Sequence, residues 1–171
     1  MEEYSYSKIT RYIECPLSYM RKYLNEEIPD SHGVTESGLF MHKLMEKYEN
    51  GVLQQNELLE YFENKYDKNV LSNTVLNMGN GFRKDMYNIY YNGYRSYLED
   101  FTGIPNCKKI IDVERKFNFR YSIKDIEPFS ITGVIDLVFQ DNEDKLIVLD
   151  HKSKKNRRGN IQGNYTCMPM H

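Results

Sequence analysis

The spacing of hydrophobic residues changes near residue 105, where helical intervals give way to strict alternation. Before that point apolar residues recur every three or four positions, which predicts helices. Ser7 is the expected cap of the first helix, and Gly51 the expected stop of the one that begins near Gly38. The expected helices are two short ones within residues 5–25, followed by residues 38–50, 56–67 and 82–101.

The two short helices each carry one apolar face, which is expected to pack inward. The second begins at Pro16, and Cys15 is expected to be buried at the junction between the two helices. The apolar faces consist of Ile9, Tyr12 and Ile13 in the first helix and Leu17, Met20 and Leu24 in the second.

The long helix over 82–101 carries aromatic residues at helical intervals: Tyr87, Tyr90, Tyr91, Tyr94, Tyr97 and Phe101. Such a stripe is able to stack nucleic-acid bases. An amphipathic helix that buries its rings and leaves its hydroxyls in water has the same pattern. The pattern favours this second interpretation.

After residue 105 the alternation predicts three strands, over residues 108–121, 129–139 and 145–152. The polar sequence QDNED between the last two predicts a hairpin. The tail from 153 to 171 is expected to be irregular. Together the elements predict an α/β (α+β) fold, helical over its first two-thirds, with helices flanking a small mixed sheet. We expect a single domain over residues 1–171.

Composition and charge argue against several classes of protein. The chain has 171 residues and a net charge of −2, which argues against a generally basic coat for nucleic acid but allows a locally basic site. It begins with MEEYSYSKITRYIEC, which lacks the apolar core of a signal peptide, and no apolar run is long enough to span a membrane. The expected location is therefore cytoplasmic, without membrane association.

Three charged residues interrupt the two most hydrophobic predicted strands. Asp136 lies within ITGVIDLVF, and Asp150 and Lys152 end KLIVLDHK. Because side chains alternate along a strand, Asp150 and Lys152 share one face. If the two strands pair with matching faces, Asp136 joins them. Buried or half-buried charges are costly unless a partner, a metal or a reaction requires them.

Two neighbouring carboxylates repel each other, and a divalent cation removes that conflict. Mg²⁺ is commonly held by one or two carboxylates together with water and substrate phosphates. It activates water and stabilises the charge that develops on a phosphodiester, and a nearby lysine contacts the phosphate or the attacking water. The three residues therefore match a site for metal-assisted phosphodiester hydrolysis. The alternatives to a metal site are that Asp136 is an isolated residue at a bulge or strand edge, and that Asp150 and Lys152 form an exposed ion pair.

These motifs resemble the PD-(D/E)xK nuclease superfamily, with Asp136 as the first acid and Asp150-His151-Lys152 as the D-x-K element. SYSKITRYIECPLSYMRKY and GLFMHKLMEKY are similar to segments of its RecB-like branch, which includes recombination and CRISPR-associated exonucleases. The resemblance implies a restriction-endonuclease-like core and Mg²⁺ or Mn²⁺ as cofactor. It implies metal ligation by His42, Asp136, Asp150 and the carbonyl of His151. Glu46, one turn after His42, is expected to orient that histidine.

The C-terminal region departs from the family pattern. Relatives continue past D-x-K into a helix bearing Q-x-x-x-Y, whereas this chain offers Gln162 and Tyr165 in a segment that does not have a helical pattern. The chain is therefore expected to be short at its C-terminus. Many relatives hold a [4Fe–4S] cluster with four cysteines, but this chain has only Cys15, Cys107 and Cys167, so we expect no cluster.

A basic cluster directly follows the D-x-K element: Lys154, Lys155, Arg157 and Arg158. Such runs are usually solvated surface, but beside a metal site they suit contacts to the phosphates of DNA without sequence specificity. The leading prediction is a metal-dependent deoxyribonuclease, an exonuclease on single-stranded or end-containing DNA in recombination, repair or CRISPR-type processing. The alternatives are a catalytically impaired nuclease-like module that binds DNA or docks on a nuclease or CRISPR complex, and a protein-interaction domain without nucleic acid.

Overall fold

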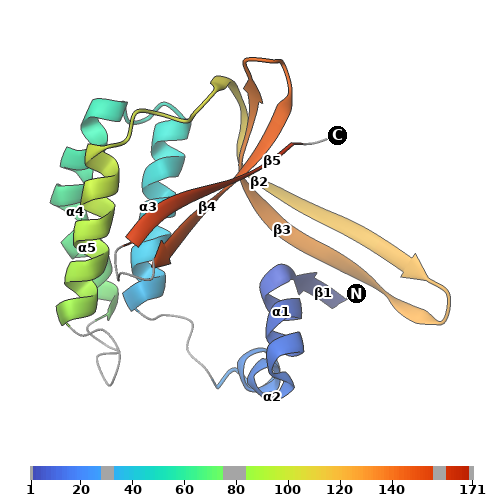
Figure 1. Cartoon of the computed structure of the whole chain (residues 1–171). Coiled ribbons are helices and arrows are strands. Elements are labelled where there is room, and N and C mark those ends of the chain that lie inside the picture. The colour runs from blue at the N-terminus through green and yellow to red at the C-terminus, as the bar shows by residue number, and fades with distance from the viewer. Residues whose placement is uncertain (1, 28–32, 75–83, 156–160, 170–171) are drawn as a thin grey trace. The chain divides into compact units, whose positions relative to one another are not determined.

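The computed structural model describes residues 2–27, 33–74, 84–155 and 161–169. For residues 33–34, 71–74, 84–86, 153–155 and 161–169 it describes the backbone alone. The described elements form a mixed α/β fold (Figure 1), which confirms the fold class predicted from the sequence. No helix within these ranges combines the length and the apolar character that crossing a membrane requires.

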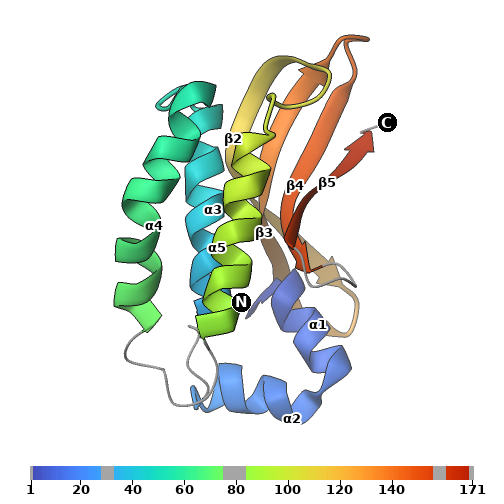
Figure 2. The same cartoon turned by 60° about the vertical axis from the view of Figure 1, so that its left-hand side comes forward.

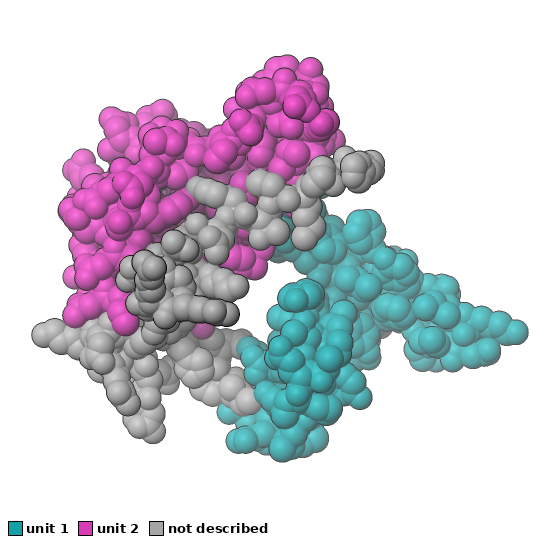
Figure 3. Space-filling model, in the orientation of Figure 1, with its two compact units in different colours: residues 1–30, 114–135 teal, residues 31–113, 136–171 magenta. Residues whose placement is uncertain are grey.

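The chain divides into two compact units, which Figure 3 colours separately. Unit 1 comprises residues 1–30 and 114–135, and unit 2 comprises residues 31–113 and 136–171. The two long strands β2 (Cys107–Ile123) and β3 (Ile126–Asp141) each contribute residues to both units.

Unit 1 begins with strand β1 (Glu2–Ser5), which pairs in parallel with residues 129–132 of β3. Helix α1 (Tyr6–Glu14) follows, then α2 (Pro16–Tyr19), which continues as the π-helical turn η1 (Met20–Leu24). The cap of α1 is Ser5, whose hydroxyl accepts from the Lys8 N–H, so the prediction of Ser7 was wrong by two residues. Strand β1 was not predicted, because four residues are too short for a clear alternation.

The apolar faces predicted for the two short helices do not pack inward. Their side chains are exposed to between 38% and 75%, and Cys15 is also exposed rather than buried. The predicted spacing is correct, since α1 is strongly amphipathic, but periodicity alone does not tell which surface a helix covers.

Unit 2 contains three long helices: α3 (Gly33–Glu49), α4 (Leu58–Thr74, preceded by the short 3₁₀ turn η2, Gln55–Glu57) and α5 (Lys84–Glu99). They share a core that includes Leu44, Leu58, Phe62 and Tyr66, each exposed by no more than 1%. Tyr94 and Phe101 are buried in the same core, and the other rings of the α5 stripe pack against it. The amphipathic interpretation of this stripe is therefore confirmed.

Helix α3 begins five residues before the predicted start at Gly38. Its end agrees with the prediction, because Gly51 adopts a φ of 71° and donates its N–H to the carbonyl of Tyr48. A left-handed residue just after a helix is favourable for glycine.

The sheet of the described residues has five strands, in the order β1-β3-β4-β5, with β2 also pairing with β3. Strand β4 (Leu146–Lys155) is antiparallel to both β3 and β5 (Ile161–Pro169), and Figure 2 shows β4 and β5 side by side. The predicted β3–β4 hairpin is confirmed. The tail was predicted to be irregular, but its residues 153–155 continue β4 and its residues 161–169 form β5, so that prediction was wrong for the described part of the tail.

Between the strands of unit 2 lies a second, smaller apolar cluster. Leu137, Phe139 and Leu149 are almost completely buried there. Burying each such side chain contributes on the order of 2 kcal/mol, which fixes the register of β3 against β4. This register determines where the charged residues of the next pairs come to lie.

Candidate functional site

The pairing of β3 with β4 brings Asp136 and Asp150 together. Leu137 pairs with Leu149 and Val138 with Val148 in antiparallel register. Continuing this register by one step places Asp136 opposite Asp150, since both lie one residue beyond the Leu137–Leu149 pair. The two carboxylates therefore share a face with each other, as the alternation predicts.

Lys152 lies beside Asp150 on the same face of β4. Its Nζ atom is 3.0 Å from Asp150 Oδ1, and the two side chains are 63% and 42% exposed. An ion pair with this exposure contributes little to stability. The ammonium group therefore remains accessible to an incoming phosphate.

Asp136 is the most buried of the three charged residues, with a side chain that is 12% exposed. Its Oδ2 atom accepts a hydrogen bond of 2.7 Å from the backbone N–H of His151. This bond ties the first acid to the peptide group inside the D-x-K element. Asp136 keeps further lone pairs for another partner, because a carboxylate accepts at about four positions.

His42 on α3 faces this carboxylate. Its Nδ1 atom lies 3.6 Å from Asp136 Oδ2, which is too long for a hydrogen bond. Burial lowers the pKa of His42, although the negative charge of Asp136 acts in the opposite direction. The imidazole is therefore neutral at pH 7, the form in which a ring nitrogen binds a metal.

A second contact joins α3 to β4 through Glu49 and His151. Glu49 Oε1 and His151 Nε2 are hydrogen-bonded at 2.6 Å, and their side chains are 1% and 12% exposed. Burial raises the pKa of Glu49, and the His151 contact opposes that rise. Glu49 of α3 binds the His151 side chain, and Asp136 accepts the His151 backbone N–H. The central residue of the D-x-K element therefore has a hydrogen bond to each of two other elements.

Sequence reasoning missed Glu49; the acid that it named on this helix, Glu46, was predicted to orient His42. No hydrogen bond or ion pair joins the described side chains of Glu46 and His42; Glu46 lines a surface pocket with Lys43, Lys47, Asn50 and Val52. The signal for Glu49 was present, because residues 42, 46 and 49 share a helical face at i, i+4 and i+7. An acid seven residues after a histidine, directly after the core residues Met45 and Tyr48, was the available clue.

For several predicted site residues the structure describes only the backbone, or does not describe the residue at all. Arg157 and Arg158 fall outside the described residues, and Lys154 and Lys155 are described only as backbone of β4. Gln162 and Tyr165 lie on β5, where their Cα atoms pair with those of Lys154 and His151. The expectation that they do not form a helix is confirmed.

The donor set suits a hard or borderline divalent cation. The His42 imidazole and the Asp136 carboxylate meet at 3.6 Å, and Asp150 lies one residue beyond the last pair of the β3–β4 register, Leu137–Leu149. Nitrogen and oxygen donors of this kind hold Mg²⁺, Mn²⁺ and Zn²⁺. In unit 2, His42 and Asp136 thus have donor atoms close enough to each other to hold a metal ion.

Comparison with known proteins agrees with the motifs. A family model described as the PD-(D/E)XK nuclease superfamily matches residues 3–166, which is nearly the whole chain and includes every residue of the site described above. Searches of curated proteins and of solved structures found no match. On the extent of the family match, the chain belongs to the PD-(D/E)XK nuclease superfamily.

Proposed function

We propose that this protein is a Mg²⁺- or Mn²⁺-dependent deoxyribonuclease that hydrolyses phosphodiester bonds at the site formed by His42, Asp136, Asp150 and Lys152. Membership of the superfamily implies a metal-dependent nuclease with DNA as substrate. The observation that carries the proposal is the approach of His42 Nδ1 to Asp136 Oδ2 at 3.6 Å. These residues are 94 positions apart in the sequence. At this distance the two atoms are too far apart for a hydrogen bond, but both are able to bind the same metal ion.

The four residues have two proposed roles, metal binding and contact with the substrate. His42, Asp136 and Asp150 bind the metal, together with the backbone carbonyl of His151. When bound, the metal lowers the pKa of a water molecule and stabilises negative charge on the scissile phosphate. Lys152, exposed beside Asp150, contacts that phosphate or positions the attacking water.

The remaining residues hold this arrangement in place. The His151 N–H keeps Asp136 oriented, and Glu49 restrains the His151 side chain. Holding ligands through such outer contacts commonly changes metal affinity or activity 10- to 100-fold. The role predicted for Glu46, orientation of His42, remains a proposal.

The proposed substrate is single-stranded or end-containing DNA, bound without sequence specificity. The motifs that resemble the RecB-like branch support an exonuclease that acts in recombination, repair or CRISPR-type processing, with a protein complex of that kind as a partner. Phosphate contacts by Lys154, Lys155, Arg157 and Arg158 are part of the proposal.

A second candidate is a catalytically impaired nuclease-like module that binds DNA or docks on a nuclease complex. One observation favours it: Gln162 and Tyr165 lie on strand β5, whereas relatives carry their Q-x-x-x-Y pair on a helix. This candidate retains metal and DNA binding and loses hydrolysis.

Cleavage of defined DNA substrates separates the two candidates. The purified protein is incubated with linear single-stranded, linear double-stranded and closed circular DNA, with Mn²⁺, with Mg²⁺ or with EDTA. Metal-dependent loss of the linear forms with circular DNA intact supports the exonuclease. Cleavage of circles makes the enzyme an endonuclease. No cleavage by a folded protein that binds Mn²⁺ in calorimetry supports the impaired module.

A further inference from the structure

Unit 1 carries an aromatic and basic segment that the proposed metal site does not use. Residues 115–124 of β2 and its turn read RKFNFRYSIK, with four basic residues, three aromatic residues and no acid. The chain as a whole has a net charge of −2, so this density of positive charge is local. Interleaved aromatic and basic residues are the composition of surfaces that bind nucleic-acid strands.

Alternation along β2 sorts the aromatic residues onto one face. Phe117, Phe119 and Tyr121 are two residues apart in turn, so their rings share a face of the β2–β3 hairpin. The rings of Phe117 and Phe119 have centroids 5.3 Å apart, and the Tyr121 ring stacks on Phe129 of β3 at 5.5 Å with an interplanar angle of 20°. The result is a row of four rings across two strands.

The outer part of this row is open to solvent. Phe119 is 58% exposed and Tyr121 is 42% exposed, although both are large aromatic side chains. Contiguous exposed apolar surface of this kind marks a binding site more often than a chance feature. Exposed aromatic rings of this kind are able to stack on the bases of a single strand.

The inner end of the row is held rigidly. An ideal Cβ on Gly133 would lie 2.5 Å from the Phe117 ring, so the ring packs directly against the glycine backbone. Phe117 in turn supports Phe119. A platform whose rings are already ordered loses little conformational entropy when it binds a ligand.

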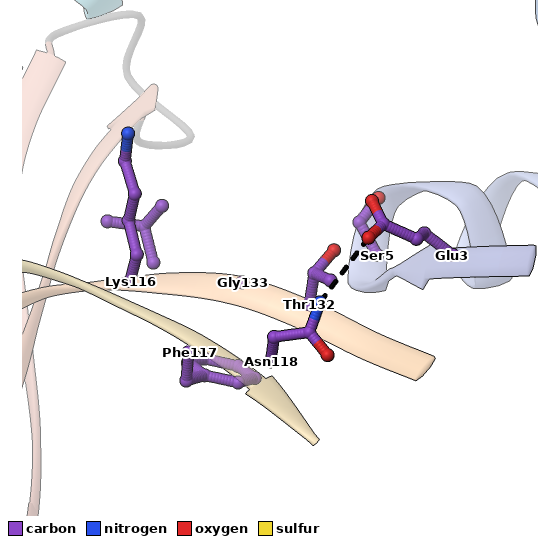
Figure 4. A pocket seen from close by; sticks show the side chains of 8 residues that line it. Glu3, Ser5, Lys116, Phe117, Asn118, Thr132 and Gly133 are labelled. Carbon is purple, nitrogen blue, oxygen red and sulfur yellow. Dashed lines mark hydrogen bonds between the residues drawn. The ribbon is translucent and has the colours of Figure 1, made fainter. Parts of the chain in front are cut away.

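Three of the basic residues lie outside the face that carries the rings. Lys116 and Arg120 are exposed on the opposite face of β2, and Lys124 is exposed in the hairpin turn. Figure 4 shows Lys116 and the Phe117 ring leaving β2 on opposite sides. A pocket of about 510 Å³ that both Lys116 and Phe117 line also contains Glu3, which accepts a hydrogen bond from Asn118, so that pocket is not a selective anion site. Lys124, in the turn that follows Tyr121, therefore suits a backbone phosphate of a strand whose bases lie on the rings.

We propose that the β2–β3 hairpin of unit 1 is a binding platform for single-stranded DNA, on which bases stack against Phe119 and Tyr121 while Lys124 in the hairpin turn contacts a phosphate. This inference rests on the proposed function, since it names the strand form that the nuclease engages. Duplex DNA keeps its bases stacked and cannot use the rings in this way.

Fluorescence anisotropy with a labelled oligothymidine of about 20 nucleotides tests the platform. The titration is done in EDTA, so that metal-dependent cleavage does not consume the probe. Because stacking of one base on an aromatic ring contributes about 1–3 kcal/mol, Phe119→Ala and Tyr121→Ala should each weaken binding by roughly 5- to 150-fold. Phe119→Trp should retain affinity. Tyr12→Ala removes another exposed aromatic ring of unit 1, from α1, and should leave affinity unchanged.

Salt dependence provides a second readout. Replacing Lys124 by Ser should reduce the slope of log affinity against log salt by about 0.7, the value for one phosphate contact on a single strand. Circular dichroism of each variant checks that the sheet is intact. Wild-type affinity in both ring variants, or equal affinity for a hairpin duplex of the same length, would overturn the proposal. So would a sedimentation result in which the wild type is a dimer and the ring variants are monomers, since a second copy then covers the rings.

The outcomes for the hairpin and for the nuclease are separable. If the ring variants lose binding while the wild type cleaves no DNA under any metal condition, the platform is correct and the proposed activity is wrong. If the wild type cleaves linear DNA and the ring variants bind the probe normally, the activity is correct and the platform is wrong.

Discussion

Glu49 and His151 are hydrogen-bonded at 2.6 Å, across 102 positions of the sequence, and connect the end of α3 to the centre of the D-x-K element. The same His151 donates its N–H to Asp136. One residue therefore links the helix that bears His42 with both strands that bear the acids. Since Glu49 is 1% exposed, removing its partner leaves a buried carboxyl group without compensation.

A double-mutant cycle on this pair should reveal strong coupling. Glu49→Ala and His151→Ala are each expected to reduce the free energy of unfolding by about 1–3 kcal/mol, because each leaves a buried polar group unsatisfied. The double variant should be more stable than the sum of the two losses predicts, with a coupling of about 0.5–3 kcal/mol. Urea denaturation followed by circular dichroism measures all four proteins. Additive losses would show that the contact does not contribute to stability.

Metal binding should depend on His42 and Asp136. We expect His42→Ala and Asp136→Asn each to weaken Mn²⁺ binding at pH 7.5 by at least about tenfold, equivalent to roughly 1.4 kcal/mol, because each removes one donor. Isothermal calorimetry measures the affinity. Glu143→Gln, in the exposed β3–β4 turn, is the matched control that removes one carboxylate elsewhere. If the control lowers the affinity as much as the site variants do, Mn²⁺ binds by general attraction to surface charge.

Tyr66 should make the fold sensitive to alkaline pH. This side chain is completely buried among the helices of unit 2, and its hydroxyl donates to Ser37 Oγ at 2.8 Å. Burial raises the pKa of Tyr66 well above 10. As pH rises past 10, the unfolded chain loses this proton while the folded chain retains it, so stability falls.

Tyr66→Phe removes that contribution. At pH 7 the free energy of unfolding of this variant should be about 1 kcal/mol below that of the wild type, because the hydrogen bond to Ser37 is lost. Between pH 10 and 11 its free energy of unfolding should fall less than that of the wild type. Urea denaturation across this pH range provides the measurement, with Tyr6→Phe on the exposed surface of α1 as control. Parallel curves for wild type and Tyr66→Phe would exclude Tyr66 as a source of the alkaline loss.

Gly133 should tolerate no side chain. Gly133→Ala places a methyl group 2.5 Å from the Phe117 ring, and such overpacking typically costs about 1–3 kcal/mol. Gly38→Ala is the matched control, because its added methyl group meets nothing within 4 Å and alanine is favourable in a helix. Thermal unfolding should show a lower melting temperature for Gly133→Ala only. Adding Phe117→Leu should restore part of the loss; an equal effect of both glycine variants would contradict the contact.

The sequence predicted the structure correctly where the hydrophobic pattern extended over many residues and one face of the helix or strand was buried. The strands around Asp136 and Asp150 alternate over many residues, so both their faces and their hairpin were predicted correctly. Helix α3 and the stripe on α5 have clear helical spacing, and their inner residues are buried as expected. D-x-K spacing also predicted correctly that Asp150 and Lys152 lie side by side.

The failures have physical causes. Strand β5 carries polar residues and glycine, and it forms because β4 offers an open edge, which is a tertiary effect. The apolar faces of α1 and α2 show that periodicity indicates amphipathic character without identifying what covers it. Glu49 was missed because Glu46 had the expected spacing from His42, whereas the partner of Glu49 is His151, 102 positions away, which spacing along a helix does not predict.

The central claim is that the carboxylates of this site carry out metal-dependent DNA hydrolysis. The most direct test is the initial rate at which wild type, Asp150→Asn and the matched control Glu143→Gln degrade linear single-stranded DNA in Mn²⁺. Both substitutions change one carboxylate to an amide, in β4 for Asp150 and in the turn between β3 and β4 for Glu143, and calorimetric unfolding confirms that each variant is folded. We predict that Asp150→Asn loses at least about a hundredfold in rate, near 2.7 kcal/mol of transition-state stabilisation, and that Glu143→Gln retains the wild-type rate. Equal rates for wild type and Asp150→Asn would contradict the assignment of hydrolysis to this site.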